Sequence, residues 1–321
     1  MLRGPLGEPD AITRFSGHET FPLRRLWLRK AYWAVRDADS TKTAKSVFDK
    51  DDGLIRFGVG KNMVWAIRHW AQVCRIIEET EKLGRYRVTP LGDLLFHPMR
   101  GVDPYMESVG STWLLHWLIA SNPSQATTWY YAFNHLNIGR FDREALAAPL
   151  RDLCIRLQRS RSSSATIKRD VECFVRSYVP PSGSSTVEDE IESVLGEIGI
   201  LKEVSSRSFE FQRGPKPTLP DGVFLFALDE FWRERTIRRG VELAGLSVEE
   251  IAYEPGSPGR IFKMDEESIV DRLVSIEDLS SGAFRWSDSA GVRVVARLNS
   301  GVQPLDFIRA GLHLAPREVA S

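Results

Sequence analysis

The side chains best suited to chemistry lie together in residues 15–30, whose sequence is FSGHETFPLRRLWLRK. An adjacent histidine and glutamate could activate a water molecule or bind a divalent metal ion. The arginines and the lysine that follow could bind a phosphate group and stabilise the charge that develops on it during hydrolysis. The segment therefore suggests attack of water on a phosphodiester. The candidate catalytic residues are His18, Glu19, Arg24, Arg25 and Lys30.

A structural role is equally compatible with these residues, and residue types alone favour it. Glu19 could pair with one of the arginines to fix the start of a helix, and His18 could be a buried residue with satisfied hydrogen bonds. The two residues are adjacent, so one helix cannot present both to a metal as in a His-Glu-x-x-His site. A metal held by Glu19 and His18 would need ligands from a loop.

A second block, residues 58–75, is typical of a helix that contacts DNA. Apolar residues recur every three or four positions, which predicts a helix over residues 62–77, and Gly58 and Gly60 provide the turn before it. The opposite face carries basic, amide and aromatic side chains, which can pair with phosphates and base edges. The candidate DNA-contacting residues here are Lys61, Asn62, Trp65, Arg68, His69, Gln72 and Arg75.

The glycines and lysine of this block could also indicate a phosphate-binding loop, but their spacing excludes it. Ile55 stands where a Walker loop has glycine, and Asn62 stands where it has Ser or Thr. An ordinary solvated charged face remains the alternative to DNA contact, since many helices have one. The glycine turn before the helix and the strand predicted after it favour DNA contact.

The elements around these residues have the order of a winged helix-turn-helix module. A helix is predicted from Pro22 to about Asp37, and a strand over residues 86–88 follows the second helix. A similar order recurs near the C-terminus, with helices over residues 248–252 and 265–275 and strands over 284–286 and 292–298. A helix over residues 165–178 carries two further candidate DNA-contacting residues off its apolar stripe, Lys168 and Arg169.

These patterns predict a mainly α protein with small β-wings, an α+β chain of several winged helix-turn-helix-like modules joined by helical segments. Three domains are expected. Residues 1–100 would form an N-terminal winged-helix-like DNA-binding domain that includes the FSGHETFPLR block. Residues 101–180 would form a helical, Trp-rich middle segment, and residues 181–321 a C-terminal winged-helix-like domain.

Composition limits the kind of protein this can be. The 43 basic and 43 acidic side chains balance, so DNA binding must depend on local basic faces and not on a global field. The three cysteines lie far apart, which favours reduced thiols in a cytoplasmic protein. No apolar run is long enough to span a bilayer, so no membrane association is expected.

Several longer blocks resemble one protein family, the domain of unknown function 4007. The blocks are residues 15–24 (FSGHETFPLR), 58–64 (GVGKNMV), 66–70 (AIRHW), 89–92 (TPLG), 112–118 (TWLLHWL) and 121–123 (SNP). Together they extend over nearly the whole chain. Members of this family occur beside DNA phosphorothioation genes in bacterial defence clusters, and its SspB-like branch is associated with DNA nicking.

The resemblance implies an antiviral defence protein that binds double-stranded DNA and nicks one strand, so that sulfur can enter the backbone. A nickase of this kind is expected to use a divalent cation, with magnesium the expected ion and Glu19 and His18 its expected ligands. The implied partners are a cysteine desulfurase and ATP-dependent sulfur-transfer proteins, and a homodimer is left open. The sequence contains no recognised nuclease motif, which leaves a second hypothesis: a non-catalytic DNA-binding adaptor or transcriptional regulator that recruits the sulfur-transfer partners.

Overall fold

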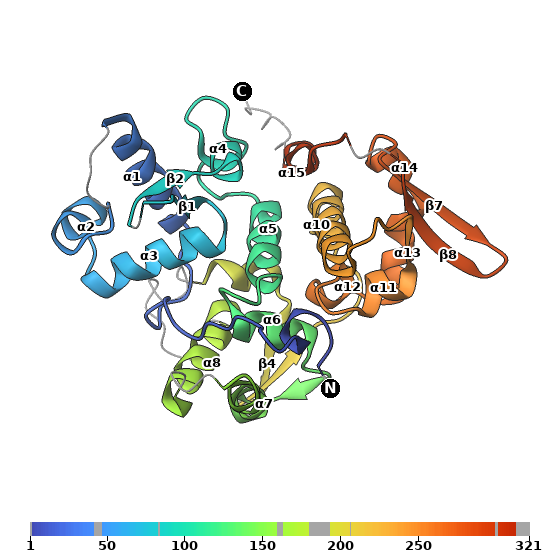
Figure 1. Ribbon diagram of the computed structural model, residues 1–321, viewed down its shortest axis with the longest axis horizontal. Helices are drawn as coiled ribbons and strands as arrows, with labels where there is room; N and C mark the ends of the chain where they lie inside the picture. The colour runs from blue at the N-terminus through green and yellow to red at the C-terminus, as the bar shows by residue number, and fades with distance from the viewer. Residues whose placement is uncertain are drawn as a thin grey trace, which may run out of the picture.

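The computed structural model describes residues 2–41, 47–82, 84–158, 163–179, 193–205, 207–298 and 301–312. Within these residues the protein is mainly helical, with three small antiparallel sheets of two, three and three strands (Figure 1). This confirms the predicted α+β class. No helix in the described parts of the chain is long and apolar enough to cross a membrane.

The N-terminal part is a cluster of helices closed by a short hairpin. After a 3-10 turn at Pro5–Gly7, its elements are α1 (Trp27–Thr41), α2 (Lys50–Phe57), α3 (Lys61–Val73), β1 (Ile77–Glu79), β2 (Tyr86–Val88) and α4 (Pro90–Phe96). Helix α2 ends at Gly58, whose φ of 64° is the left-handed conformation that glycine adopts without strain. Two boundaries differ from the prediction. Helix α1 begins at Trp27 instead of Pro22, and α3 ends at Val73 because Ile77 already belongs to β1.

The middle part begins with a helix that has no polar face. Its elements are α5 (Val109–Ala120), α6 (Thr127–Asn134), β3 (Arg140–Phe141), α7 (Arg143–Arg156), α8 (Ser164–Tyr178), the 3-10 helix η2 (Val194–Ile198), β4 (Leu201–Ser205) and β5 (Ser208–Phe211). Every residue of α5 from Gly110 to Ala120 is buried, which places this helix in the centre of the molecule. The three strands pair antiparallel in the order β3-β5-β4.

The C-terminal part repeats that strand arrangement. Its elements are α10 (Asp221–Arg239), β6 (Gly245–Ser247), α11 (Val248–Tyr253), α12 (Pro258–Ile261), α13 (Glu266–Val274), α14 (Ile276–Leu279), β7 (Phe284–Ser289), β8 (Val292–Arg297) and α15 (Pro304–Leu312). The sheet has the order β6-β8-β7, and the β7–β8 hairpin projects away from the body of the molecule (Figure 1). Helix α10 packs against α5 and α15, so it joins this part to the centre.

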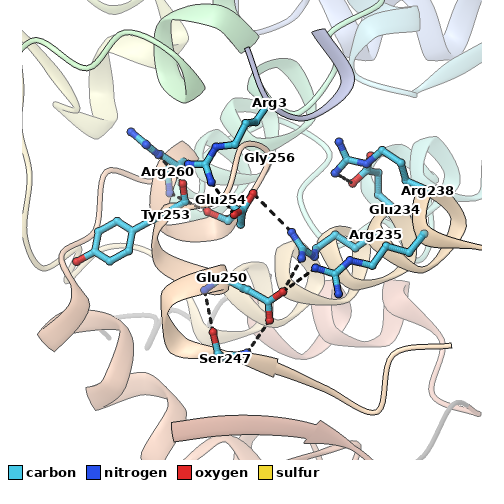
Figure 2. A network of polar contacts seen from close by, with 12 residues as sticks. Arg3, Glu234, Arg235, Arg238, Ser247, Glu250, Tyr253, Glu254, Gly256 and Arg260 are labelled. Atoms are coloured by element: carbon cyan, nitrogen blue, oxygen red, sulfur yellow. Dashed lines mark hydrogen bonds and ion pairs between the residues drawn. The ribbon is translucent and has the colours of Figure 1, made fainter. Parts of the chain in front are cut away.

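A network of ion pairs fixes α11 against α10 (Figure 2). The guanidinium of Arg235 on α10 is almost completely buried and pairs with Glu250 at 2.5 Å and with Glu254 at 3.7 Å. Glu250 also closes a capping box with Ser247 at the start of α11. Arg3 reaches Glu254 at 3.1 Å, so the N-terminal end of the chain is tied to the C-terminal part.

Candidate nucleic-acid interface

The exposed face of α3 carries most of the side chains predicted to contact DNA. Lys61, Trp65, Arg68 and Gln72 are half-buried on this face, and Asn62 is exposed at its start. The Lys61 ammonium lies 4.3 Å from the centroid of the Trp65 ring, a distance at which cation and ring attract each other. The face thus presents two cations, an aromatic ring and the Gln72 amide at spacings of three or four residues, with the Asn62 amide beside them.

Two neighbours from other segments extend this face. Tyr86 on β2 and Arg14, in the segment before the FSGHETFPLR block, both lie near Arg68. Burial and the Arg68 charge lower the pKa of Arg14, whereas burial raises the pKa of Tyr86 against the opposing effect of Arg68. Arg14 donates to Gln125 at 2.6 Å. The sequence prediction missed Arg14 and Tyr86, because only the fold brings them beside α3.

Two residues predicted on this face lie elsewhere. His69 is 3% exposed and packs edge-on against Trp70, so it cannot contact DNA. Arg75 lies beyond the end of α3 with φ 53°, a conformation that directs it away from the helix face. Its guanidinium binds both carboxylate oxygens of Glu230 on α10, at 2.7 and 2.6 Å. These two predictions are therefore corrected: His69 lies on the buried face of α3, and Arg75 lies past the turn that ends the helix.

His18 is a buried residue enclosed by aromatic rings. Its ring stacks on Trp70 at a centroid distance of 6.0 Å and meets Trp129 edge-on at 5.8 Å. Nε2 lies 2.6 Å from the Asp170 carboxylate on α8, and the backbone N–H of Thr20 donates to Nδ1 at 3.0 Å. His18 therefore links the N-terminal block to α8.

This environment does not fit a metal ligand. Burial lowers the pKa of His18, whereas the Asp170 carboxylate beside Nε2 raises it. The charged ring has no lone pair, and in the neutral ring the Nδ1 lone pair accepts from Thr20. Among the residues that the structure describes, no three His, Cys, Asp or Glu side chains are arranged to hold a metal ion. The predicted role of His18 as a metal ligand is corrected on these grounds.

The remaining candidate catalytic residues do not converge on His18. Arg24 lies over the Trp27 ring at 5.3 Å. Arg25 donates to the Met106 carbonyl and pairs with Glu197 at 3.2 Å, and Lys30 donates to the Phe57 carbonyl at 3.4 Å. These side chains fix the start of α1 to its surroundings, as expected for a structural role.

Glu19 has a half-exposed side chain and an unusual backbone conformation. It has a φ of 50° and Thr20 a φ of 68°, two consecutive left-handed residues that are not glycine. Such conformations cost on the order of 1 kcal/mol or more each, and they are tolerated where the surrounding structure holds them. The loop is therefore built tightly around His18 and leaves Glu19 toward the surface.

Helix α8 presents a second basic face. Lys168 and Arg169 are both exposed, whereas Asp170, the next residue, is 2% exposed and bonded to His18. The sequence prediction missed Asp170, although a signal was present: it is a charged residue at an inward position of the helical stripe that includes Ile167 and Phe174.

A family model described as "Protein of unknown function (DUF4007)" matches residues 15–308. The chain belongs to the DUF4007 family. Two solved structures are similar to this DUF4007 protein over almost its whole length. A crystal structure of magnesium ion-bound SspB is 26% identical with a TM-score of 0.76, covering 97% of this chain and 92% of that chain. A crystal structure of SspB is 28% identical with the same TM-score, covering 94% and 89%. No curated protein sequence matches the chain.

These matches confirm the resemblance carried by the sequence blocks. The magnesium ion is a property of the SspB crystal, while the described residues of the DUF4007 protein contain no three-ligand carboxylate, histidine and cysteine cluster.

Proposed function

We propose that this DUF4007 protein binds double-stranded DNA through α3 and α8, and that it nicks one strand in an SspB-like role within a DNA phosphorothioation defence system. The observation that carries the proposal is the basic-aromatic face of α3, formed by Lys61, Trp65 and Arg68. Among the described residues Lys61 contacts the Trp65 ring and Arg68 contacts Tyr86, and neither pairs with a carboxylate, so their charge is available for phosphates.

We infer that the chain is built from three winged-helix modules. In both three-stranded sheets the third strand in the sequence lies in the middle and pairs with the first and second strands. The helices between the first two strands are α7–α8 in one sheet and α11–α14 in the other. The N-terminal part has three helices followed by a hairpin, which is the same order without the first strand. In such modules the helix before the hairpin enters the major groove.

These modules support a division of the chain into domains that differs from the predicted division. The predicted boundary after residue 180 lies outside the described residues. Strands β4 and β5 pair with β3, which supports a boundary between the middle and C-terminal modules after Phe211.

Charge distinguishes the three modules. The helices before the hairpins of the first two, α3 and α8, expose lysine and arginine. The exposed face of α13 in the third carries Glu267 and Asp271, and its Arg272 pairs with Asp221 at 2.5 Å. DNA repels such a face, so we assign duplex binding to the first two modules. The third module is free to bind the proposed protein partners, a cysteine desulfurase and ATP-dependent sulfur-transfer proteins.

Glu19 is our candidate for the nicking step. It is the one carboxylate of the FSGHETFPLR block, and its half-exposed side chain can approach a bound strand. Arg24, also half-exposed in the same block, is the candidate for binding the scissile phosphate. The magnesium-bound SspB structure supports a requirement for a divalent cation.

A non-catalytic adaptor that recruits the sulfur-transfer partners is the second candidate. One observation favours it: His18 is enclosed by Asp170, Trp70 and Trp129, which removes the residue best suited to act as a general base.

A supercoiled-plasmid assay tests both candidates. Purified protein is incubated with plasmid and magnesium, manganese or chelator, alongside the Glu19→Gln and Arg68→Ala variants. The nickase proposal expects metal-dependent conversion to open circle that Glu19→Gln abolishes while duplex binding is kept. A shift of duplex DNA without any conversion would select the adaptor. Absence of both conversion and shift would refute DNA binding itself.

A further inference from the structure

A cavity of about 730 Å³ lies between the first residues of the chain and α10. Small-molecule sites typically measure roughly 300–1,000 Å³, so this volume can hold a nucleoside. One wall is the N-terminal arm, residues 2–12. The arm is tied down by the Arg3–Glu254 pair at one end and by Arg156, which donates to the Leu6 carbonyl.

The cavity has an apolar wall and an apolar rim. Leu6, Trp117 and Phe231 line it, and so do two isoleucines from different walls, Ile12 on the arm and Ile237 on α10. Ile12 is 65% exposed and Ile237 is 81% exposed, so both side chains are accessible to a ligand. Apolar side chains on two walls suit a flat ring that lies between them.

Its polar groups suit a neutral ligand that forms hydrogen bonds. The lining contains three arginines and four carboxylates, among them the Arg238–Glu234 pair at 3.2 Å, drawn near Gly256 in Figure 2. The cavity therefore has no excess of positive charge to attract a phosphate. Tyr130 also lines it, and its buried hydroxyl has no hydrogen-bond partner within the described residues. Donors and acceptors in a lining whose formal charge is −1, three arginines against four carboxylates, match the edge of a neutral nucleobase.

The cavity adjoins a second hollow beside α3 across the Arg75–Glu230 ion pair. This second hollow, of about 600 Å³, is lined by Gln72 of α3 and by Gln125, the partner of Arg14. Both hollows are lined by Arg75 and Glu230, so they meet at this ion pair. A strand leaving α3 would pass Gln72 and Arg75 on its way to the cavity.

We propose that this cavity binds a nucleobase extruded from the duplex held on α3, clamped between Ile12 and Ile237. The phosphates stay outside the cavity, because its lining has one more carboxylate than arginine and does not attract them. The proposal rests on the duplex binding proposed above. Extruding a base costs a few kcal/mol, and an apolar clamp of this kind lowers that cost.

The test uses the full chain and fluorescent 2-aminopurine in two forms. In one arm the base is part of a duplex; in the other it is the free 2-aminopurine deoxyriboside, which carries no phosphate. The variant is Ile12→Ser with Ile237→Ser, both at exposed positions where folding should tolerate the change. Ile55→Ser is the matched control, because Ile55 is an 87% exposed isoleucine on α2 outside the cavity lining.

The expected result is a fluorescence rise when the wild-type protein and the Ile55→Ser control bind the duplex, and none with the double variant at unchanged duplex affinity. The free deoxyriboside should bind with little salt dependence, and the double variant should bind it about tenfold more weakly. Equal signals from the double variant and the wild type would overturn the proposal, as would wild-type protein that binds the duplex but leaves the base stacked. Because the deoxyriboside arm needs no duplex, it separates failure of the cavity from failure of DNA binding on α3.

Discussion

Removing the charge of Lys61 and Arg68 together gives a direct measure of DNA contact by α3. Both side chains are partly exposed to solvent, and their contacts among the described residues are with the rings of Trp65 and Tyr86 and not with a carboxylate, so each should contact one phosphate. Each phosphate contact contributes a salt slope of about −0.9 in log K against log salt. The Lys61→Ala, Arg68→Ala double variant should therefore flatten the slope by about 1.8.

The same slope predicts the loss of affinity. Between 1 M and 0.1 M salt, two phosphate contacts contribute about 1.8 log units to the association constant. Losing both should therefore raise the dissociation constant about 60-fold at 0.1 M salt. This corresponds to about 2.4 kcal/mol. At about 1 M salt the variant and the wild-type protein should bind almost equally.

The assay is fluorescence anisotropy of a labelled duplex at four or five salt concentrations. Arg285→Ala is the matched control, an exposed arginine of the acidic third module that pairs with Glu277 at 3.0 Å and should not touch DNA. Parallel slopes for the double variant and the wild type would refute the assignment of α3 as a DNA-contacting helix. An equal loss in the Arg285→Ala control would show that the effect is not local.

Three further predictions concern stability. The pKa of buried His116 is lowered to about 3, chiefly by burial, so only the unfolded state binds a proton below about pH 6.5. This group alone should lower the free energy of unfolding by about 1 kcal/mol between pH 7 and pH 5.5, and urea titrations should find a loss smaller by that amount in His116→Gln. A double-mutant cycle of Arg75→Ala and Glu230→Gln should give a coupling of about 1 kcal/mol, because these side chains are 41% and 23% exposed and partly screened; a coupling of zero would contradict the bidentate contact. Asp170→Ala should destabilise the fold by about 3 kcal/mol by leaving His18 unpaired in its aromatic enclosure, and a thermal midpoint equal to wild type would exclude that role.

The sequence determined much of the local structure. Apolar residues at helical spacing placed α3, because burying one face of a helix leaves a periodic trace. The strands β7 and β8 were also located, although β7 continues to Ser289 and the predicted strand ended at residue 286. The same periodicity located Lys61, Trp65 and Arg68 on an exposed face. The long blocks around FSGHETFPLR and GVGKNMV were sufficient to indicate the family.

The sequence determined the ends of helices and strands less well, and residues near these ends were therefore placed wrongly. The apolar spacing of α3 continues to Ile77 and so includes Arg75, but the chain turns at Arg75 and Ile77 starts a strand. Propensity changes little over two or three residues, so tertiary contacts such as the Arg75–Glu230 pair decide where a helix ends.

Only the tertiary structure decided the role of His18 in the FSGHETFPLR block. Residue types allow His18 to bind a metal, activate water or fill a core, and these roles differ in their neighbours and not in the residue itself. The deciding neighbours are Asp170, 152 residues away, and the rings of Trp70 and Trp129. A hydrogen bond or an aromatic enclosure forms between residues that the fold brings together. The spacing of residues within one segment therefore does not predict such contacts.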